Sequence, residues 1–215
     1  MTIIHGMSNR HRMAVVARAD DASSTIEYSL LGLLHERPMY GYELARRLGN
    51  STGLGAVWHV SQSNLYGMLA KLCGRGLATV ALEDQPTRPT RKVFRLSETG
   101  ETEFARWMQS PVQHGRNIRI EFIAKLYFAR RLDPLAARTL VSEQKRACTL
   151  WYERTLARSH SSPDQEEFDT LVHEFRAGQL SAIIRWLERC EAFFDNRGVA
   201  GTAATKPVVR RKGTR

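Results

Sequence analysis

Cysteine and long apolar runs are both scarce in this chain of 215 residues. The three cysteines, Cys73, Cys148 and Cys190, lie far apart and form no CxxC pair, which excludes a disulfide scaffold and gives almost no support for a structural zinc site. The apolar run Tyr28–Leu34 is far shorter than the roughly 20 residues that a membrane helix needs. The N-terminus has no apolar core followed by a small-residue cleavage site. We therefore expect a cytoplasmic protein with no membrane partner.

The residue patterns of catalysis and metal binding are also missing. The seven histidines are scattered, and no two of them stand four residues apart. No set of nucleophile, base and orienting residue, no glycine-rich phosphate loop and no carboxylate pair emerges along the chain. The sequence therefore predicts that the protein is not an enzyme and has neither a metal site nor a cofactor.

Basic residues are plentiful, and their distribution matters more than their number. The formal net charge is +10, but residues 1–19 contribute three arginines and residues 197–215 contribute six basic residues, with no acid in either segment. The 177 residues between these tails carry a net charge of only +1. Inside them, residues 61–95 carry a net +4. This local excess is better evidence for a nucleic-acid partner than the overall charge.

Composition divides the chain into five regions. Pro111 and Gly115 interrupt the helical pattern and indicate a linker between two folded regions. The expected regions are a flexible leader (1–23), a compact domain (24–109), the linker (110–117), a helical domain (118–196) and a basic disordered tail (197–215).

The compact domain is expected to contain three helices, a β-hairpin and a fourth helix. The predicted elements are helices 24–35, 41–48 and 61–75, strands 77–82 and 92–96, and a helix from Ser97 to Gln109. Helix 61–75 is amphipathic, because Leu65, Met68, Leu69 and Leu72 form one apolar stripe. Three helices followed by a basic hairpin are typical of a winged helix-turn-helix domain.

The polar side of helix 61–75 is the predicted DNA-contact surface. A major groove about 12 Å wide admits one helix, whose outward side chains can reach the base edges. Ser61 is placed as the N-cap, and the hairpin tip adds basic side chains for the neighbouring phosphates. The predicted DNA-binding residues are Ser61, Gln62, Ser63, Asn64, Tyr66, Lys71, Arg88, Arg91 and Lys92. Tyr66 has the alternative of packing against helix 41–48, and Tyr42 is expected to pack between helices.

The helical domain is expected to contain three helices, 119–132, 134–158 and one from about residue 163 to 196. The last exceeds 30 residues, or roughly 50 Å, and carries an apolar seam at steps of mostly three and four. Such a seam suits packing against another long helix, in a second copy of the chain. Trp151 and Trp186 are candidate ligand contacts, although aromatic residues at helical spacing are more often core.

Six short segments together resemble the N-terminal domain of PadR-family transcriptional regulators. They are Leu30-Leu-Gly-Leu-Leu34, Gly41-Tyr-Glu-Leu44, Ser63-Asn-Leu-Tyr66 with Leu69, Gly76-Leu77, Arg91-Lys-Val-Phe-Arg-Leu-Ser97 and Gly100. The stretch Glu121–Phe128 resembles the helical C-terminal domain of longer members. The resemblance implies a homodimer with C-terminal dimer helices, mostly repressor function and, in some members, control by small aromatic or drug-like ligands. Gly67, Ala78 and the Val93-Phe94 pair depart from the family pattern, so an operator sequence cannot be transferred.

The sequence thus predicts a mainly α-helical protein with a small β-hairpin, a winged helix-turn-helix domain followed by a domain of long helices. The predicted function is that of a repressor that binds a palindromic operator in double-stranded DNA as a homodimer and senses a signal in its helical domain. The alternative is a winged-helix adaptor that binds proteins and has no specific DNA site.

Overall fold

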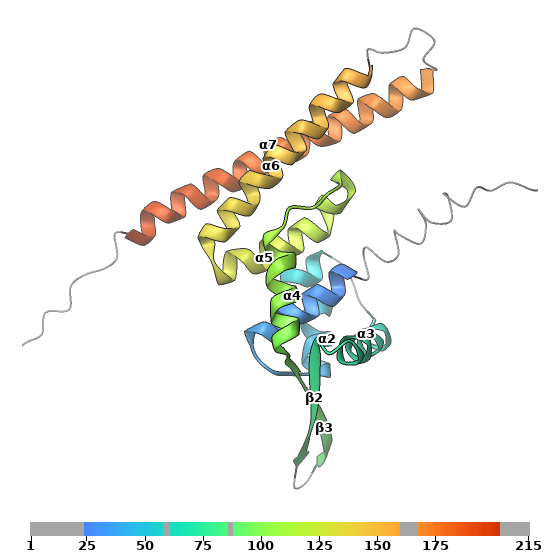
Figure 1. Cartoon of the computed structure of the whole chain (residues 1–215), viewed down its shortest axis with the longest axis vertical. Coiled ribbons are helices and arrows are strands. Elements are labelled where there is room, and N and C mark those ends of the chain that lie inside the picture. The colour runs from blue at the N-terminus through green and yellow to red at the C-terminus, as the bar shows by residue number, and fades with distance from the viewer. Residues whose placement is uncertain (1–23, 58–60, 86–87, 160–166, 203–215) are drawn as a thin grey trace, which may run out of the picture. The chain divides into compact units, whose positions relative to one another are not determined.

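The computed structural model describes residues 24–57, 61–85, 88–159 and 167–202 (Figure 1). The chain divides into two compact units, Met1–Asp133 and Pro134–Arg215. The predicted leader at 1–23 and the part of the predicted tail from 203 to 215 lie outside the described residues.

The described helices of the first unit include five that begin and end close to their predicted positions and two short 3-10 helices, η1 and η2, that were not predicted. They are a helix at 24–36, α2 (Gly41–Gly49), η1 (Gly53–Ala56), α3 (Gln62–Gly74), α4 (Glu98–Gln109), η2 (Gly115–Arg119) and α5 (Glu121–Leu132). Ser61 caps α3 by accepting a hydrogen bond from the Asn64 backbone N–H at 3.4 Å, and Ser97 caps α4 in the same way through Gly100 at 3.0 Å. The predicted N-caps are thereby confirmed.

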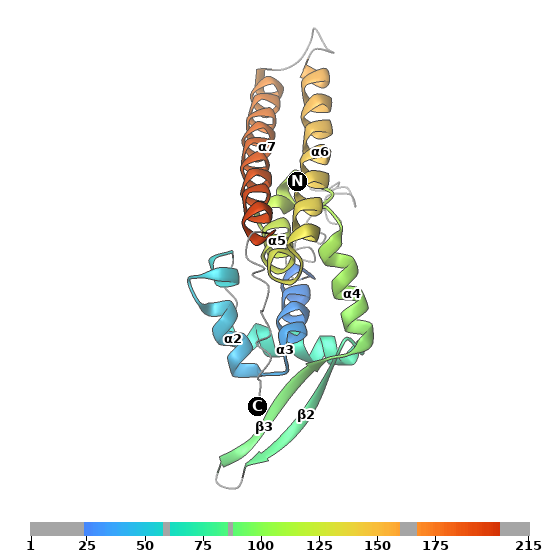
Figure 2. The same ribbon diagram turned by 90° about the vertical axis from the view of Figure 1, so that its left-hand side faces the viewer.

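The sheet is larger than the predicted hairpin. It has three antiparallel strands in the order β1-β3-β2, with bounds β1 (Met39–Tyr40), β2 (Ala78–Gln85) and β3 (Arg88–Leu96). The strands predicted at 77–82 and 92–96 are too short, because pairing continues through Glu83 with Arg91 and Gln85 with Arg88. As Figure 2 shows, the long β2–β3 ribbon projects beyond α2 and α3. We call this ribbon the wing.

The core of the first unit draws leucines and aromatic rings from its helices. Leu30, Leu44 and Leu69 are completely buried. The Phe104 ring of α4 meets the Phe128 ring of α5 edge to face, with centroids 5.3 Å apart. Because both rings are buried, α5 is fastened to the helices before it.

The first unit therefore extends beyond the segment expected to link two domains. The chain does leave helical structure after Gln109, as Pro111 and Gly115 indicate, but α5 packs with the helices before it, and Arg131 bonds Glu36 at 3.2 Å. The boundary between the two units falls after Asp133, where Pro134 starts the next helix. The domain limits deduced from sequence stay a prediction.

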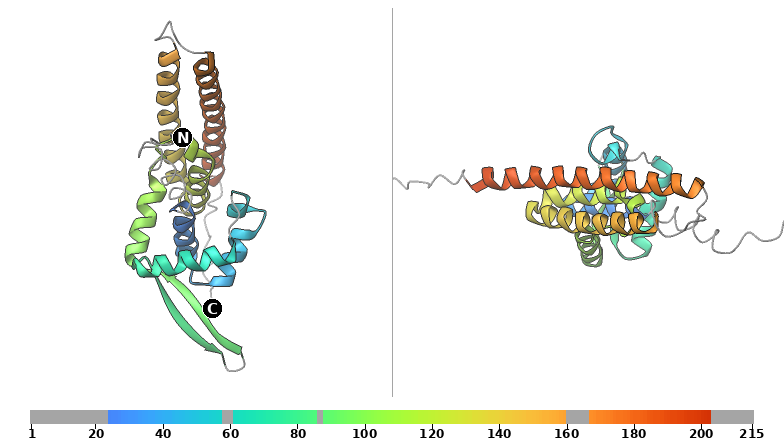
Figure 3. Two further views of the ribbon diagram at one scale, coloured as in Figure 1. Left: turned by 90° about the vertical axis from the view of Figure 1, so that its right-hand side faces the viewer. Right: turned by 90° about the horizontal axis from the view of Figure 1, so that it is seen from above.

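The described part of the second unit consists of two long helices, α6 (Pro134–Ser159) and α7 (Glu167–Thr202), which lie side by side (Figures 2 and 3). Leu140 of α6 and Leu187 of α7 are buried, and Arg138 pairs with Asp195 at 2.8 Å. Helix α7 continues to Thr202, six residues into the segment expected to be a basic tail, and the tail itself stays a prediction. Among the described residues, we find no helix that combines the length and apolar character needed to cross a bilayer.

Candidate nucleic-acid interface

Helix α3 turns one side to the core and the other to solvent. Leu65, Leu69 and Leu72 are completely buried and hold the helix to the rest of the unit. The opposite side is exposed along its length, where it presents Ser61, Gln62, Ser63, Asn64, Tyr66, Gly67, Ala70 and Lys71. The predicted contact residues of this helix thus share one open face, with hydroxyl and amide groups at its start and an ammonium group near its end.

Tyr66 belongs to this face and also packs against α2. A Cβ atom added at Gly41 would lie 2.5 Å from the Tyr66 ring, so only a glycine permits this approach. The Tyr66 side chain is nevertheless 40% exposed. The packing that the sequence left as an alternative is therefore present, because the ring lies against α2, and the DNA contact of its exposed part stays a prediction.

The wing meets α2 through two tyrosines. Tyr40 and Tyr42 stack with ring centroids 5.7 Å apart, and the Arg91 guanidinium lies 5.8 Å from each centroid. The Tyr40 hydroxyl donates a hydrogen bond to Glu83 at 2.9 Å, which raises the pKa of Tyr40 above its ordinary value. This arrangement orients Arg91 by cation–π attraction.

Tyr42 is thus a residue that the sequence analysis misplaced. It was expected to pack between helices, but it is 50% exposed beside Arg91. No local signal in the sequence places it there, because Met39–Tyr40, the two-residue strand directly before α2, is recognisable only from its pairing. Met39 pairs with Phe94 and Tyr40 with Val93, which brings the start of α2 to the wing.

The predicted wing residues do not form one cluster. Side chains alternate between the faces of a strand, so Arg91 and Lys92 point to opposite sides. Arg91 shares its face with Glu83, and Lys92 shares the other with Leu82, which is 68% exposed. Arg88 lies in β3, and its side chain is outside the described part of the structure.

A buried acid behind α3 is a further residue that the sequence analysis missed. Glu27, on the helix at 24–36, pairs with Lys71 at 2.7 Å and with Arg75 at 3.0 Å. Its side chain is 5% exposed. Its position in the apolar-rich segment before Leu30 gives no sign of this contact, which joins residues more than 40 positions apart in the sequence.

The two candidate ligand tryptophans belong to the second unit. Trp151 lies on α6 and Trp186 on α7, and both are partly buried. Their role as ligand contacts stays a prediction. In the part of the chain that the structure describes, no group of three or more His, Cys, Asp or Glu side chains could hold a metal ion.

The first unit has the architecture of a winged helix-turn-helix protein, a class that binds DNA. Its helices α2 and α3, the antiparallel wing and the open polar side of α3 are the parts by which that class is defined.

Comparison with known proteins agrees with this class. Residues 30–106 match the family described as "Transcriptional regulator PadR-like family", and residues 118–195 match "Virulence activator alpha C-term". The chain is 28% identical to the negative transcriptional regulator PadR of Bacillus subtilis over 181 residues, which covers 79% of this chain and 97% of that protein. Residues 30–106 therefore belong to the PadR-like family of transcriptional regulators, which are DNA-binding proteins and not enzymes.

The solved structures similar to the chain include two of one regulator. The crystal structure of Bacillus subtilis PadR in complex with operator DNA is 24% identical, covers 78% of this chain and 98% of that one, and gives a TM-score of 0.39. The structure of the same regulator with p-coumaric acid is 23% identical, covers 80% and 99%, and gives a TM-score of 0.36.

Proposed function

We propose that the protein is a homodimeric repressor that reads a palindromic operator with α3 and the wing. One observation carries the proposal: the polar side of α3 is exposed beside a basic wing, while its leucines are buried. Helix α3 has 13 residues, or about 20 Å, which suits insertion into one major groove. The proposed contacts are Ser61, Gln62, Ser63, Asn64, Tyr66, Lys71, Arg88, Arg91 and Lys92.

The homodimer is proposed to form through the second unit. Phe168, Leu171 and Phe175 of α7 are 69%, 58% and 65% exposed, and their spacing of three and four places them on one side of the helix. A stripe of this kind is costly in water and is typical of a helix that packs against a partner. A two-fold dimer would place two copies of α3 in successive major grooves, about 34 Å apart, on an inverted repeat.

Repression and effector control are proposed from relatives. The Bacillus subtilis protein that aligns over 97% of its length is a negative regulator, which supports repression here. That regulator has been crystallised with p-coumaric acid, which supports a small aromatic effector for this chain. Trp151 and Trp186 are the proposed contacts, and an effector that favours one arrangement of the dimer by about 1–3 kcal/mol would suffice for control. Such a regulator acts in the cytoplasm, where the DNA lies.

The test is selection of bound fragments from sheared DNA of the source organism. A repressor enriches fragments that share an inverted repeat, and its log K falls steeply with log salt, by about 0.9 for each phosphate neutralised. The proposal would be refuted if no fragment is enriched and the affinity for DNA does not change with salt concentration. That result would support the adaptor alternative.

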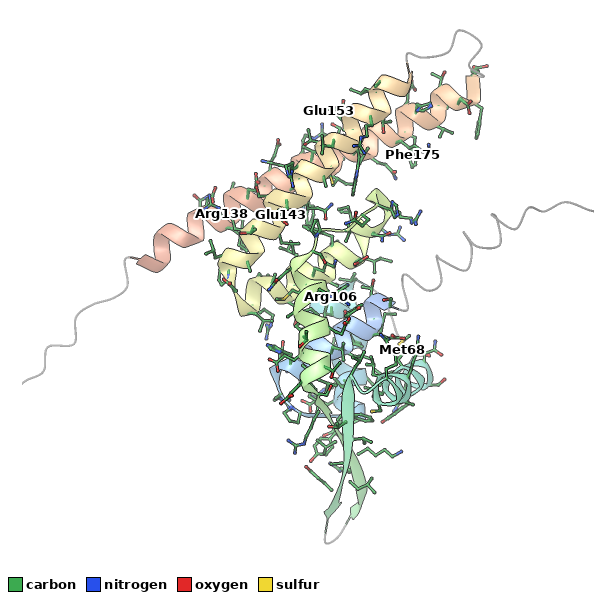
Figure 4. All side chains as sticks on the ribbon, in the orientation of Figure 1. Met68, Arg106, Arg138, Glu143, Glu153 and Phe175 are labelled. Carbon is green, nitrogen blue, oxygen red and sulfur yellow. The ribbon has the colours of Figure 1, made fainter. Side chains whose placement is uncertain are left out.

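A pair of charge-matched variants locates the interface. Arg91→Ala removes the cation held by Tyr40 and Tyr42, and should weaken binding to the selected fragment several-fold without lowering the melting temperature. Arg106→Ala removes the same charge from α4, where Arg106 is exposed and bonds Glu103 at 2.7 Å (Figure 4). Equal losses in both variants would mean that the wing is not the contact surface.

A further inference from the structure

A single buried carboxylate holds the two cations at the end of α3. The side chain of Glu27 is 5% exposed, whereas those of Lys71 and Arg75 are 59% and 49% exposed. The Lys71 ammonium lies 2.7 Å from one carboxylate oxygen, and the Arg75 guanidinium donates a hydrogen bond of 3.0 Å to the other. Lys71 and Arg75 stand four residues apart, so both leave α3 on one side and converge on the same acid.

This contact differs from an ordinary surface ion pair. Two exposed partners gain little from pairing, because water solvates each of them separately. A carboxylate withdrawn from water has no such alternative, and an unpaired charge there is costly. Lys71 and Arg75 are therefore held near Glu27 rather than left to extend freely toward whatever anion approaches α3.

The consequence for DNA binding is electrostatic. Non-specific affinity comes almost entirely from cations that replace the counterions of phosphates. Glu27 places one negative charge against two positive charges at the end of α3. The remainder of the face, from Ser61 to Tyr66, is uncharged and offers hydroxyl and amide groups suited to base edges.

We propose that Glu27 is a specificity-determining residue of the DNA interface: by pairing with Lys71 and Arg75 it withholds their charge from indiscriminate phosphate contact and fixes their direction. Binding then depends more on what the uncharged start of α3 finds in the groove. This inference rests on the proposed use of α3 as the DNA-contact helix.

The test compares Glu27→Gln with Glu101→Gln in the full-length chain. Glutamine keeps the size of glutamate and removes its charge. Glu101, an exposed residue of α4 that lies 3.6 Å from His35, loses the same charge away from α3. Affinity is measured for the selected operator fragment and for a random duplex of equal length, from 50 to 300 mM salt, and melting is followed by circular dichroism.

Release of Lys71 and Arg75 should strengthen binding to random DNA. Glu27→Gln should steepen the slope of log K against log salt on random DNA by about 1 to 2, as one or two more phosphates are neutralised. The preference for the operator should fall about tenfold, while Glu101→Gln leaves slope and preference near the wild-type values. Adding Lys71→Ala and Arg75→Ala to Glu27→Gln should abolish the extra slope.

Three results would overturn the inference. The first is a Glu27→Gln slope equal to that of Glu101→Gln, since a merely structural acid changes stability and not the number of phosphates neutralised. The second is an extra slope that survives loss of both cations. If Glu27→Gln does not fold, Glu27→Asp replaces it, because aspartate keeps the charge but is too short to reach both cations. The third contradicting result is then an unchanged operator preference in Glu27→Asp. Wild-type protein without any operator preference would instead refute the proposed function itself.

Discussion

At the scale of single residues, Gly76 shows how one backbone angle ends α3 and starts the wing. Its φ is +71°, in the left-handed region where a Cβ atom is disfavoured. Its N–H bonds the Cys73 carbonyl at 3.0 Å, and the next N–H, of Leu77, bonds Leu72 at 3.0 Å. These two bonds form a Schellman motif, which satisfies carbonyls at the helix end and turns the chain into β2.

Gly76→Ala should therefore lower the free energy of unfolding by about 1–2 kcal/mol, because alanine is strained at this angle. The matched control is Gly74→Ala, two residues earlier, where the angle is not positive and an added Cβ meets nothing within 4 Å. That variant should keep or slightly raise stability, since alanine favours helix. Urea unfolding of both variants checks the pair, and equal effects would contradict the role given to Gly76.

Lys125 is a second residue whose surroundings lead to a testable prediction about stability. It is 2% exposed, bonds the Ser110 carbonyl at 2.8 Å and Glu121 at 2.9 Å, and lies 5.3 Å from the Trp107 ring centroid. Lys125→Met leaves the Ser110 carbonyl and the Glu121 carboxylate without this donor. We expect a loss of about 2 kcal/mol in the free energy of unfolding, measured with urea at pH 7.

The difference in stability between wild type and Lys125→Met should also change with pH in a definite direction. Burial lowers the pKa of Lys125 below its ordinary value, despite the opposing effect of Glu121. Between the lowered pKa and the ordinary one, the unfolded chain binds more protons than the folded chain, so this group's contribution to stability rises with pH. The stability difference between wild type and Lys125→Met should therefore grow from pH 7 toward pH 10. A difference that shrinks would contradict a lowered pKa.

At the scale of elements, the helices could be predicted from the sequence, whereas the sheet could be predicted only in part. The apolar stripe of α3 and the serine caps of α3 and α4 are local signals, and local signals fix helix ends well. Strand β1 has two residues, too few for any period, and it exists because Met39 and Tyr40 pair with Phe94 and Val93 more than 50 positions later. A contact of that range leaves no mark on the short segment itself.

The full length of the wing could not be predicted from the sequence, for a different reason. Pro89 and the charged residues around it are typical of a loop, yet Arg88–Leu96 is one strand. At Pro89 the strand has a neighbour on one side only, since β1 reaches no further than Val93 and Phe94. Proline is tolerated at such an edge. The exposed candidate residues of α3 were predictable from its stripe, whereas the contacts of Glu27 and Tyr42 depend on tertiary pairing.

The junction between α2 and the wing gives a prediction about Tyr42. Tyr42→Ala removes one of the two rings that hold Arg91, and should weaken binding to the operator fragment about three- to tenfold, as expected for loss of an exposed cation–π contact. Tyr42→Phe keeps the ring and should bind nearly as wild type. Because Tyr42 is 50% exposed, neither variant should melt early. Equal weakening by both variants would assign the effect to the hydroxyl group instead.

At the scale of the whole molecule, the two units expose different surfaces, and the proposed DNA contact and the proposed self-association fall on different units. The first unit carries the open polar side of α3 and the wing, whereas α7 of the second unit exposes Phe168, Leu171 and Phe175. Substitutions in one unit can be scored by DNA contact and in the other by self-association. The proposed homodimer can therefore be tested by substitutions in α7 alone.

Phe175, labelled on α7 in Figure 4, and Leu171 are the positions to change. Leu171→Glu with Phe175→Glu places two charges in the exposed stripe, and like charges meeting across a dimer are repelled. Sedimentation should give about twice 24.4 kDa for wild type and about 24.4 kDa for the double variant. Operator affinity should fall by about 100-fold or more, since each half-site is then bound alone.

Thr170→Glu is the control for this experiment. Thr170 is exposed, adjacent in sequence to the stripe and on the opposite side of α7, so it adds a charge without entering the contact. It should remain a dimer with wild-type operator affinity. A monomeric wild-type protein, or a double variant that sediments as a dimer, would show that Phe168, Leu171 and Phe175 face something other than a second copy of this chain.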